Sequence, residues 1–139
     1  MNPNIQSLIS VSQKSVRNII GLMSGTSLDG LDVAYCKISG SGTSTKAEVV
    51  HFTTFPYDEE TKSEIRKVFA QKTIDFQHLA LLNEWIGIKH GEIVLDCLQQ
   101  WKLNTSDVDV SASHGQTVMH APKSLHQQDC TQITLFLVN

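Results

Sequence analysis

A segment rich in glycine and hydroxyl side chains near the start of the chain has the residue types that bind phosphate. Residues 21–32, GLMSGTSLDGLD, combine three glycines with three hydroxyl side chains. Where no Cβ intervenes, backbone N–H groups and hydroxyls can approach a ligand closely. Asp29 and Asp32 close the segment, and two carboxylates there could hold Mg²⁺ through its retained waters. Apolar residues on both sides predict a strand, a tight turn and a second strand, and the first hypothesis is a nucleotide-phosphate loop.

A plain β-hairpin is the alternative interpretation of this segment. The Asp29-Gly30 pair would then only supply the positive φ that a tight turn needs. The segment matches neither GxxxxGK[ST] nor GxGxxG, and residues 40–46, GSGTSTK, lack the glycine that precedes the lysine of a P-loop. From the residue types alone, both interpretations stay open.

A second group of polar residues lies at 111–122, SASHGQTVMHAP, where an imidazole, an amide and hydroxyls surround a glycine at the end of a predicted strand. The imidazole of His114 can orient a substrate, and Gln116 offers both a donor and an acceptor, so a polyhydroxylated ligand could be hydrogen-bonded there. The alternative is that His114 only bonds the backbone of its own loop. His114, His120 and His126 have no i, i+4 spacing and no HExxH context, and no GxSxG accompanies any serine. These patterns argue against a transition-metal site and a serine hydrolase.

The elements that must position these residues follow from hydrophobic periodicity. Strands are predicted at 16–23, 31–38, 47–55, 108–113 and 131–138, and helices at 58–71 and 75–101. Gly87 and Gly91 inside the long helix suggest a kink or a close helix contact. Three strands forming a meander, followed by helices and a further strand, predict an α/β domain with a mixed sheet and flanking helices.

Composition limits the classes of protein that this chain can represent. The 139 residues carry 11 basic and 14 acidic side chains, a net charge of −3, which favours neither nucleic acid nor an anionic membrane as partner. Three scattered cysteines suit reduced thiols in the cytoplasm. Residues 1–15 are expected to be a disordered extension and 16–139 a single domain.

Together the two motifs closely resemble those of the anhydro-N-acetylmuramic acid kinases, bacterial enzymes whose N-terminal signature GLMSGTSxDGxD is followed by SHGQTVxHxP. Here the motifs stand at 21–32 and 113–122, and the resemblance runs from about residue 18 to residue 122. It implies a fold of the sugar kinase, Hsp70 and actin type, in which two ribonuclease-H-like domains enclose ATP. Water and ATP would convert 1,6-anhydro-N-acetylmuramate to N-acetylmuramate 6-phosphate and ADP, a step of peptidoglycan recycling.

The resemblance also assigns roles to residues. It implies ATP binding by Gly25, Thr26, Ser27, Leu28, Asp29, Gly30, Leu31 and Asp32, sugar binding by His114, Gln116 and Thr117, and Mg²⁺ held by Asp32. Related ATPases end their first strand in an aspartate, whereas Met23 stands at that position here.

Family members are more than twice as long as this chain, and their catalytic aspartate lies in a later segment. We therefore expect a catalytic residue beyond Asn139 and an incomplete ribonuclease-H-like domain that lacks its second domain. Such a fragment would bind ATP weakly and would not turn over alone; the full-length protein would be a homodimer. The alternative function is a non-catalytic domain that keeps the fold and binds a partner through its bare apolar surface.

Overall fold

The computed structural model describes residues 2–126 and 135–138. The helices are α1 (Pro3–Ser12), α2 (Glu59–Arg66), α3 (Phe76–Trp101) and α4 (Lys123–His126), and the strands are β1 (Val16–Ser24), β2 (Gly30–Ser39), β3 (Lys46–Pro56), β4 (Val110–Ala121) and β5 (Leu135–Val138). None of the described helices has the length and apolar character needed to cross a membrane.

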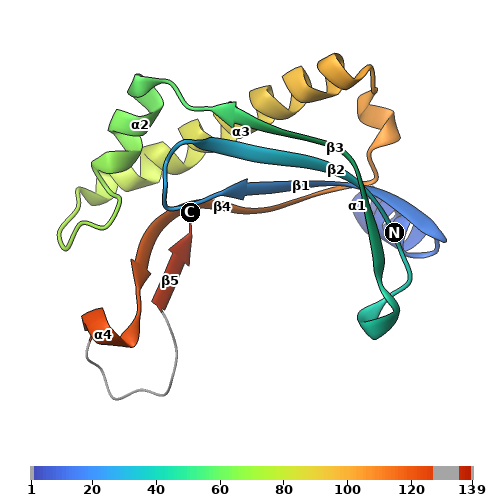
Figure 1. Ribbon diagram of the computed structural model, residues 1–139, viewed down its shortest axis with the longest axis horizontal. Coiled ribbons are helices and arrows are strands. Elements are labelled where there is room, and N and C mark those ends of the chain that lie inside the picture. Colours follow the sequence, from blue (N-terminus) through green and yellow to red (C-terminus); the bar gives the residue numbers. More distant parts are fainter. Residues whose placement is uncertain (1, 127–134, 139) are drawn as a thin grey trace.

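The strands form one mixed sheet in the order β3-β2-β1-β4-β5 (Figure 1). β1, β2 and β3 are an antiparallel meander, β4 runs parallel to β1, and β5 is antiparallel to β4. Helices α2 and α3 lie on the same side of this sheet. The α/β class, the meander, the parallel return strand and the mixed sheet with flanking helices are confirmed.

Helix α3 packs on one face of the sheet and closes the hydrophobic core. The Asp75 carboxylate caps its first turn by accepting from the N–H groups of Gln77 and His78, and Lys102 ends it in the left-handed conformation with φ 57°. Its buried residues recur at helical spacing and pack on the sheet: Leu82, Ile86, His90, Ile93, Cys97 and Leu98. Burying each large aliphatic side chain is worth about 1.5–3 kcal/mol. A Cβ on Gly87 or Gly91 would meet nothing within 4 Å, so the suggested close helix contact is not found among the described residues.

The N-terminal segment, for which disorder was expected, contains helix α1. Residues Pro3–Ser12 are helical, because Asn2 caps the first turn by accepting from the N–H of Asn4, and Pro3 tolerates the first helical position. No residue of α1 is buried. An isolated helix of this length is marginal in water, and without buried residues α1 gains little stability from packing on the rest of the fold.

Two further boundaries differ from the prediction. Helix α2 ends at Arg66 rather than at Gln71, because Ala70 turns left-handed (φ 56°) and its N–H donates to the Val118 carbonyl oxygen at 2.8 Å. The predicted strand 108–113 begins at Val110 and continues to Ala121, because it exchanges partners, pairing with β1 as far as Gln116 and with β5 from Thr117 on. Of the predicted strand 131–138, residues 135–138 form β5 and 131–134 lie outside the described residues. Cys36 and Cys97 are free thiols, as expected, and Cys130 also lies outside the described residues.

Gly30 is required by the close approach of β3 to β2. A Cβ at this position would lie 2.2 Å from the Phe55 carbonyl oxygen, which no side-chain movement can relieve. We expect Gly30→Ala to lower the free energy of unfolding by about 3 kcal/mol or more. Gly21→Ala in β1 is the matched control: its Cβ would meet nothing within 4 Å, so a change below about 1 kcal/mol is expected. Urea denaturation of both variants measures the difference, and equal effects would contradict the close approach.

Candidate functional site

The predicted phosphate loop is the connection from β1 to β2, residues 25–29. Thr26, Ser27 and Asp29 are exposed, whereas Leu28 is buried in the hydrophobic core. Leu28 is also the residue with positive φ, 56°, so the plain-hairpin interpretation, in which Gly30 supplies that angle, is wrong in this detail. A bulky residue in this conformation costs energy, which the burial of its side chain offsets. The buried leucine anchors the loop and leaves its hydroxyls facing outward.

Gly25 has no structural requirement for glycine within the chain. Its φ is not left-handed, and a Cβ there would make only ordinary contacts, 3.5 Å from Met23 Sδ and 3.9 Å from Ser27 Oγ. A missing side chain beside exposed hydroxyls fits a ligand that must approach the backbone, as a phosphate does.

The charge of the loop sets a condition on any phosphate that binds. Ser27 Oγ donates to Asp29 Oδ1 at 2.5 Å, and this hydrogen bond is the main cause that lowers the pKa of Asp29, so its carboxylate is ionised near neutral pH. Residues 21–32 contain no lysine or arginine. A bound polyphosphate therefore needs a cation that the loop itself does not supply.

Asp32 and His114 come from different motifs but line one hollow on the sheet face. The hollow has a volume of about 550 Å³ and a mainly apolar floor that includes Gly21, Ala34 and Phe52. Thr54 Oγ1 donates to Asp32 Oδ1 at 2.5 Å and orients this carboxylate. No group of three metal-binding side chains occurs among the described residues. Mg²⁺, which retains water and binds through one or two carboxylates plus phosphates, still suits Asp32.

Gln116 and Thr117 point away from that hollow into the protein. Their side chains are buried, with Gln116 only 1% exposed. Gln116 Oε1 accepts from Ser24 Oγ, and its amide nitrogen donates to the carbonyl oxygens of Gly25 (3.3 Å) and Thr117 (2.9 Å). Thr117 Oγ1 donates to the Ser24 carbonyl oxygen at 3.1 Å. The second motif therefore holds the start of the phosphate loop, while contact of these two residues with a sugar stays a prediction.

A β-bulge turns Gln116 inward. Leu22 pairs with Ser113, but Ser24 pairs with Gln116, so β4 has one residue more than β1 across this interval. Gly115 has φ 76°, a conformation that glycine adopts without strain. The glycine of the second motif is thus explained by backbone geometry.

Tyr57 and His90 belong to the same buried group and were missed from the sequence. Tyr57 Oη lies 2.7 Å from Ser24 Oγ and 2.7 Å from His90 Nε2. Burial raises the pKa of Tyr57 to about 12, and burial, reinforced by the nearby His114, lowers the pKa of His90 to about 4. Both side chains are therefore neutral at pH 7. The available signal was a histidine at a core position of α3, between Ile86 and Ile93.

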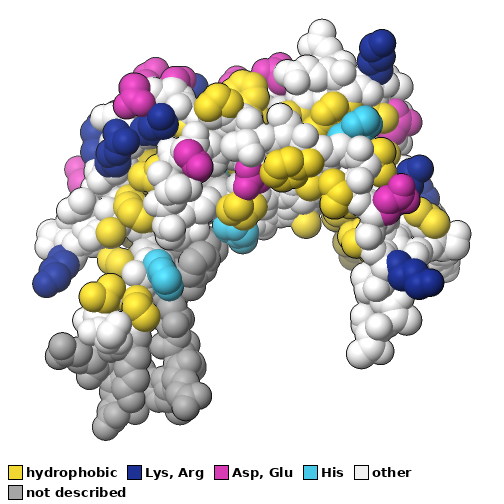
Figure 2. All heavy atoms as spheres, viewed as in Figure 1, with side chains coloured by type: hydrophobic (Ala, Val, Ile, Leu, Met, Phe, Trp, Pro, Cys, Tyr) yellow, Lys and Arg dark blue, Asp and Glu magenta, His cyan; other side chains and the backbone are white. Residues whose placement is uncertain are grey.

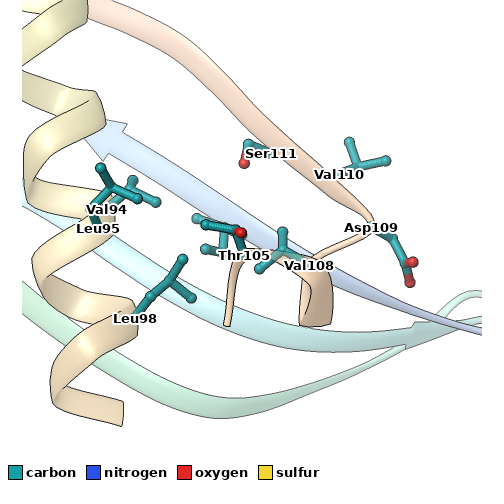
Figure 3. Close-up of a pocket in the computed structure, with 9 residues that line it drawn as sticks. Val94, Leu95, Leu98, Thr105, Val108, Asp109, Val110 and Ser111 are labelled. Carbon is teal, nitrogen blue, oxygen red and sulfur yellow. The ribbon is translucent and has the colours of Figure 1, made fainter. Parts of the chain in front are cut away.

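A separate cavity lies between the end of α3 and the start of β4 (Figure 3). It has a volume of about 240 Å³ and is lined mainly by apolar side chains, such as Val94 and Leu98. The Asp109 carboxylate points away from these two side chains and pairs with Lys14 at 2.5 Å. This cavity contains none of the predicted site residues.

The low pKa of His90 predicts a dependence of stability on pH. Between about pH 6.5 and pH 4 the unfolded chain takes up a proton at His90 that the folded chain does not, so the free energy of unfolding falls as the pH is lowered through this window. The slope contributed by one such group is at most about 1.4 kcal/mol per pH unit. His90→Gln, which keeps an N–H donor, should flatten the slope in urea denaturation at several pH values. An unchanged slope would contradict the assignment.

Comparison with known proteins agrees with the two motifs. The family model described as anhydro-N-acetylmuramic acid kinase matches residues 17–135. Curated relatives of that name include a protein from Pseudoalteromonas atlantica, 50% identical over 128 residues, and one from Pseudoalteromonas translucida, 50% identical over 127 residues. These matches cover 92% and 91% of this chain, but only 32% of each relative. The protein of that name from Caldanaerobacter subterraneus is 37% identical over 115 residues, 83% of this chain and 29% of its own length. The chain thus spans about a third of the relatives that it matches.

Proposed function

This chain belongs to the anhydro-N-acetylmuramic acid kinase family, and on that premise we propose that it carries the phosphate-binding hairpin of an ATP-dependent amino-sugar kinase. In the full-length protein the reaction would convert 1,6-anhydro-N-acetylmuramate, ATP and water to N-acetylmuramate 6-phosphate and ADP. The observation that carries the proposal is the loop at 25–29, whose exposed hydroxyls and bare Gly25 backbone stand on a buried, fully hydrogen-bonded base.

The eight residues predicted to bind ATP divide into two groups in this proposal. Leu28, Gly30 and Leu31 are buried and shape the hairpin. Gly25, Thr26, Ser27, Asp29 and Asp32 reach the surface, where backbone N–H groups and the Thr26 hydroxyl would donate to phosphate oxygens, while the Ser27 hydroxyl donates to Asp29. Mg²⁺, when bound with the nucleotide, would neutralise phosphate charge, and Asp32 is the residue of this chain best suited to hold it through water.

His114 is the proposed sugar contact. It lines the hollow that also contains Asp32, so an imidazole hydrogen bond to a sugar hydroxyl would place the acceptor close to the phosphate end of the nucleotide. We propose that the catalytic residue lies beyond Asn139 and that residues 16–139 are the N-terminal unit of the full-length protein. We further propose that this protein is cytoplasmic and forms homodimers. Neither nucleic acid nor a membrane is proposed as a partner. By itself the chain is expected to release nucleotide readily and to leave the sugar unphosphorylated.

Nucleotide binding is tested with two valine substitutions, one in the loop and one on α3. Wild-type chain should bind ATP weakly and saturably in the presence of Mg²⁺, and Gly25→Val should reduce the affinity at least about tenfold, because its side chain fills the space that the phosphates need. Gly87→Val is the control, since open space surrounds that position and it does not line the hollow. Isothermal titration of both variants gives the affinities. Wild-type chain without Mg²⁺-dependent binding, or equal loss in both variants, would argue against the proposal.

A partner-binding role without catalysis is the second candidate, and the exposed apolar residues of the sheet favour it. Met23 is 47% exposed and Phe52 59% exposed, and both line the hollow. Apolar side chains are also visible across the middle of the side of the molecule shown in Figure 2. Patches of this kind mark interaction surfaces.

The second candidate predicts self-association through this face. Sedimentation velocity should show the wild-type chain associating as concentration rises, and Phe52→Ser should reduce this association. Phe76→Ser, at the exposed start of α3 (79% exposed), is the control that should leave it unchanged. A chain that stays monomeric and binds Mg²⁺-ATP would exclude this candidate.

A further inference from the structure

Tyr57 contacts both ends of the phosphate loop. Its backbone N–H donates to the Asp29 carbonyl oxygen at 3.0 Å, at the point where the loop enters β2. Its phenol oxygen lies 2.7 Å from Ser24 Oγ, at the point where the loop leaves β1. One buried residue, which directly follows β3, therefore spans the base of the loop.

The partners of the buried side chains determine which atom donates and which accepts in each hydrogen bond of the series that connects His90 to the loop. The Gln116 amide nitrogen faces two carbonyl oxygens, so its oxygen must accept the Ser24 hydroxyl proton. Ser24 Oγ has no other proton, and it therefore accepts from Tyr57 Oη. Tyr57 Oη in turn accepts from His90 Nε2–H. The order of donors is His90, Tyr57, Ser24, Gln116, and the last donor meets the Gly25 carbonyl oxygen in the loop.

His90 is a rigid end point for this chain. It is 6% exposed and lies on the core face of α3, where Ile86 and Ile93 are also buried. The planes of the His90 and Tyr57 rings are within 5° of parallel. A change at His90 can therefore pass to the loop through the hydrogen bond to Tyr57 and through the stacked Tyr57 ring.

We propose that Tyr57 and His90 are positioning residues of the phosphate loop, which hold its two ends at a set separation so that its N–H groups and hydroxyls are arranged before a ligand arrives. The order of the loop follows directly from this series of hydrogen bonds. Only the consequence for nucleotide affinity rests on the proposed function. Preorganised loops bind more tightly because less motion is lost on binding.

The first test compares two tyrosine variants without nucleotide. Tyr57→Phe removes the phenol oxygen and keeps the backbone bond to Asp29. Tyr35→Phe is the matched control, because Tyr35 is equally buried but donates to the Asp107 carbonyl oxygen, away from the loop. Amide exchange of residues 25–29, measured by NMR or mass spectrometry, should rise at least about tenfold in Tyr57→Phe only. Equal exchange in both variants overturns the proposal.

The second test keeps the proposal falsifiable if Tyr57→Phe folds poorly. His90→Gln retains an N–H donor, whereas His90→Leu fills the space without one. We expect amide exchange of residues 25–29 to stay near the wild-type rate in the glutamine variant and to rise in the leucine variant. Side-chain packing alone would not produce this difference. Identical loop exchange in the two His90 variants overturns the proposal.

A titration with Mg²⁺-ATP separates this inference from the proposed function. If the wild-type chain binds, Tyr57→Phe should weaken the affinity about five- to twentyfold while Tyr35→Phe leaves it unchanged. A loosened loop in Tyr57→Phe together with no nucleotide binding by the wild-type chain would support the positioning role and overturn the proposed function. Unchanged affinity in Tyr57→Phe beside binding by the wild-type chain would overturn the positioning role.

Discussion

Polar groups buried where β1 meets β4 must all find hydrogen-bond partners, and this constraint shapes the site. An unpaired buried hydroxyl or amide costs about 1–3 kcal/mol, so Ser24 and Gln116 cannot be placed independently. Their bonds require the register of β4 to shift by one residue beside β1, which the bulge at Gly115 provides. The loop conformation is therefore a consequence of sheet pairing and of the buried network beneath it.

The same constraint divides each motif into an inward and an outward part. In the first motif Ser24 and Leu28 face the interior, while Thr26 and Ser27 face solvent. In the second, Gln116 bonds the loop, while His114 lines the hollow on the open sheet face. A residue in a functional motif need not contact the ligand, because the inward-facing residues of the motif can instead position the outward-facing ones.

Much of this arrangement could be predicted from the sequence, because local patterns encode it. Apolar runs and turn residues placed the meander, and the apolar spacing within residues 75–101 placed α3. The remaining features depend on contacts between distant segments. The extent of β4 depends on an exchange of partner strands, and the role of Gly30 on the approach of Phe55. Likewise, the hydrogen bond between Tyr57 and His90 joins residues 33 positions apart, and no local pattern marks it.

Neutrality of the buried network would suit the proposed role of the loop, which has no basic side chains of its own and would bind an anion. Burial keeps the Tyr57 phenol protonated and the His90 imidazole uncharged at neutral pH. An imidazolium at His90 would attract the anion at long range, but its desolvation would destabilise the fold. Hydrogen bonds between neutral groups fix the position of the loop without the desolvation cost of a buried charge. In the proposed function, attraction of the phosphates would then be left to backbone dipoles and to a cation bound with the ligand, both acting at the exposed side of the loop where Asp29 and Asp32 reach the surface.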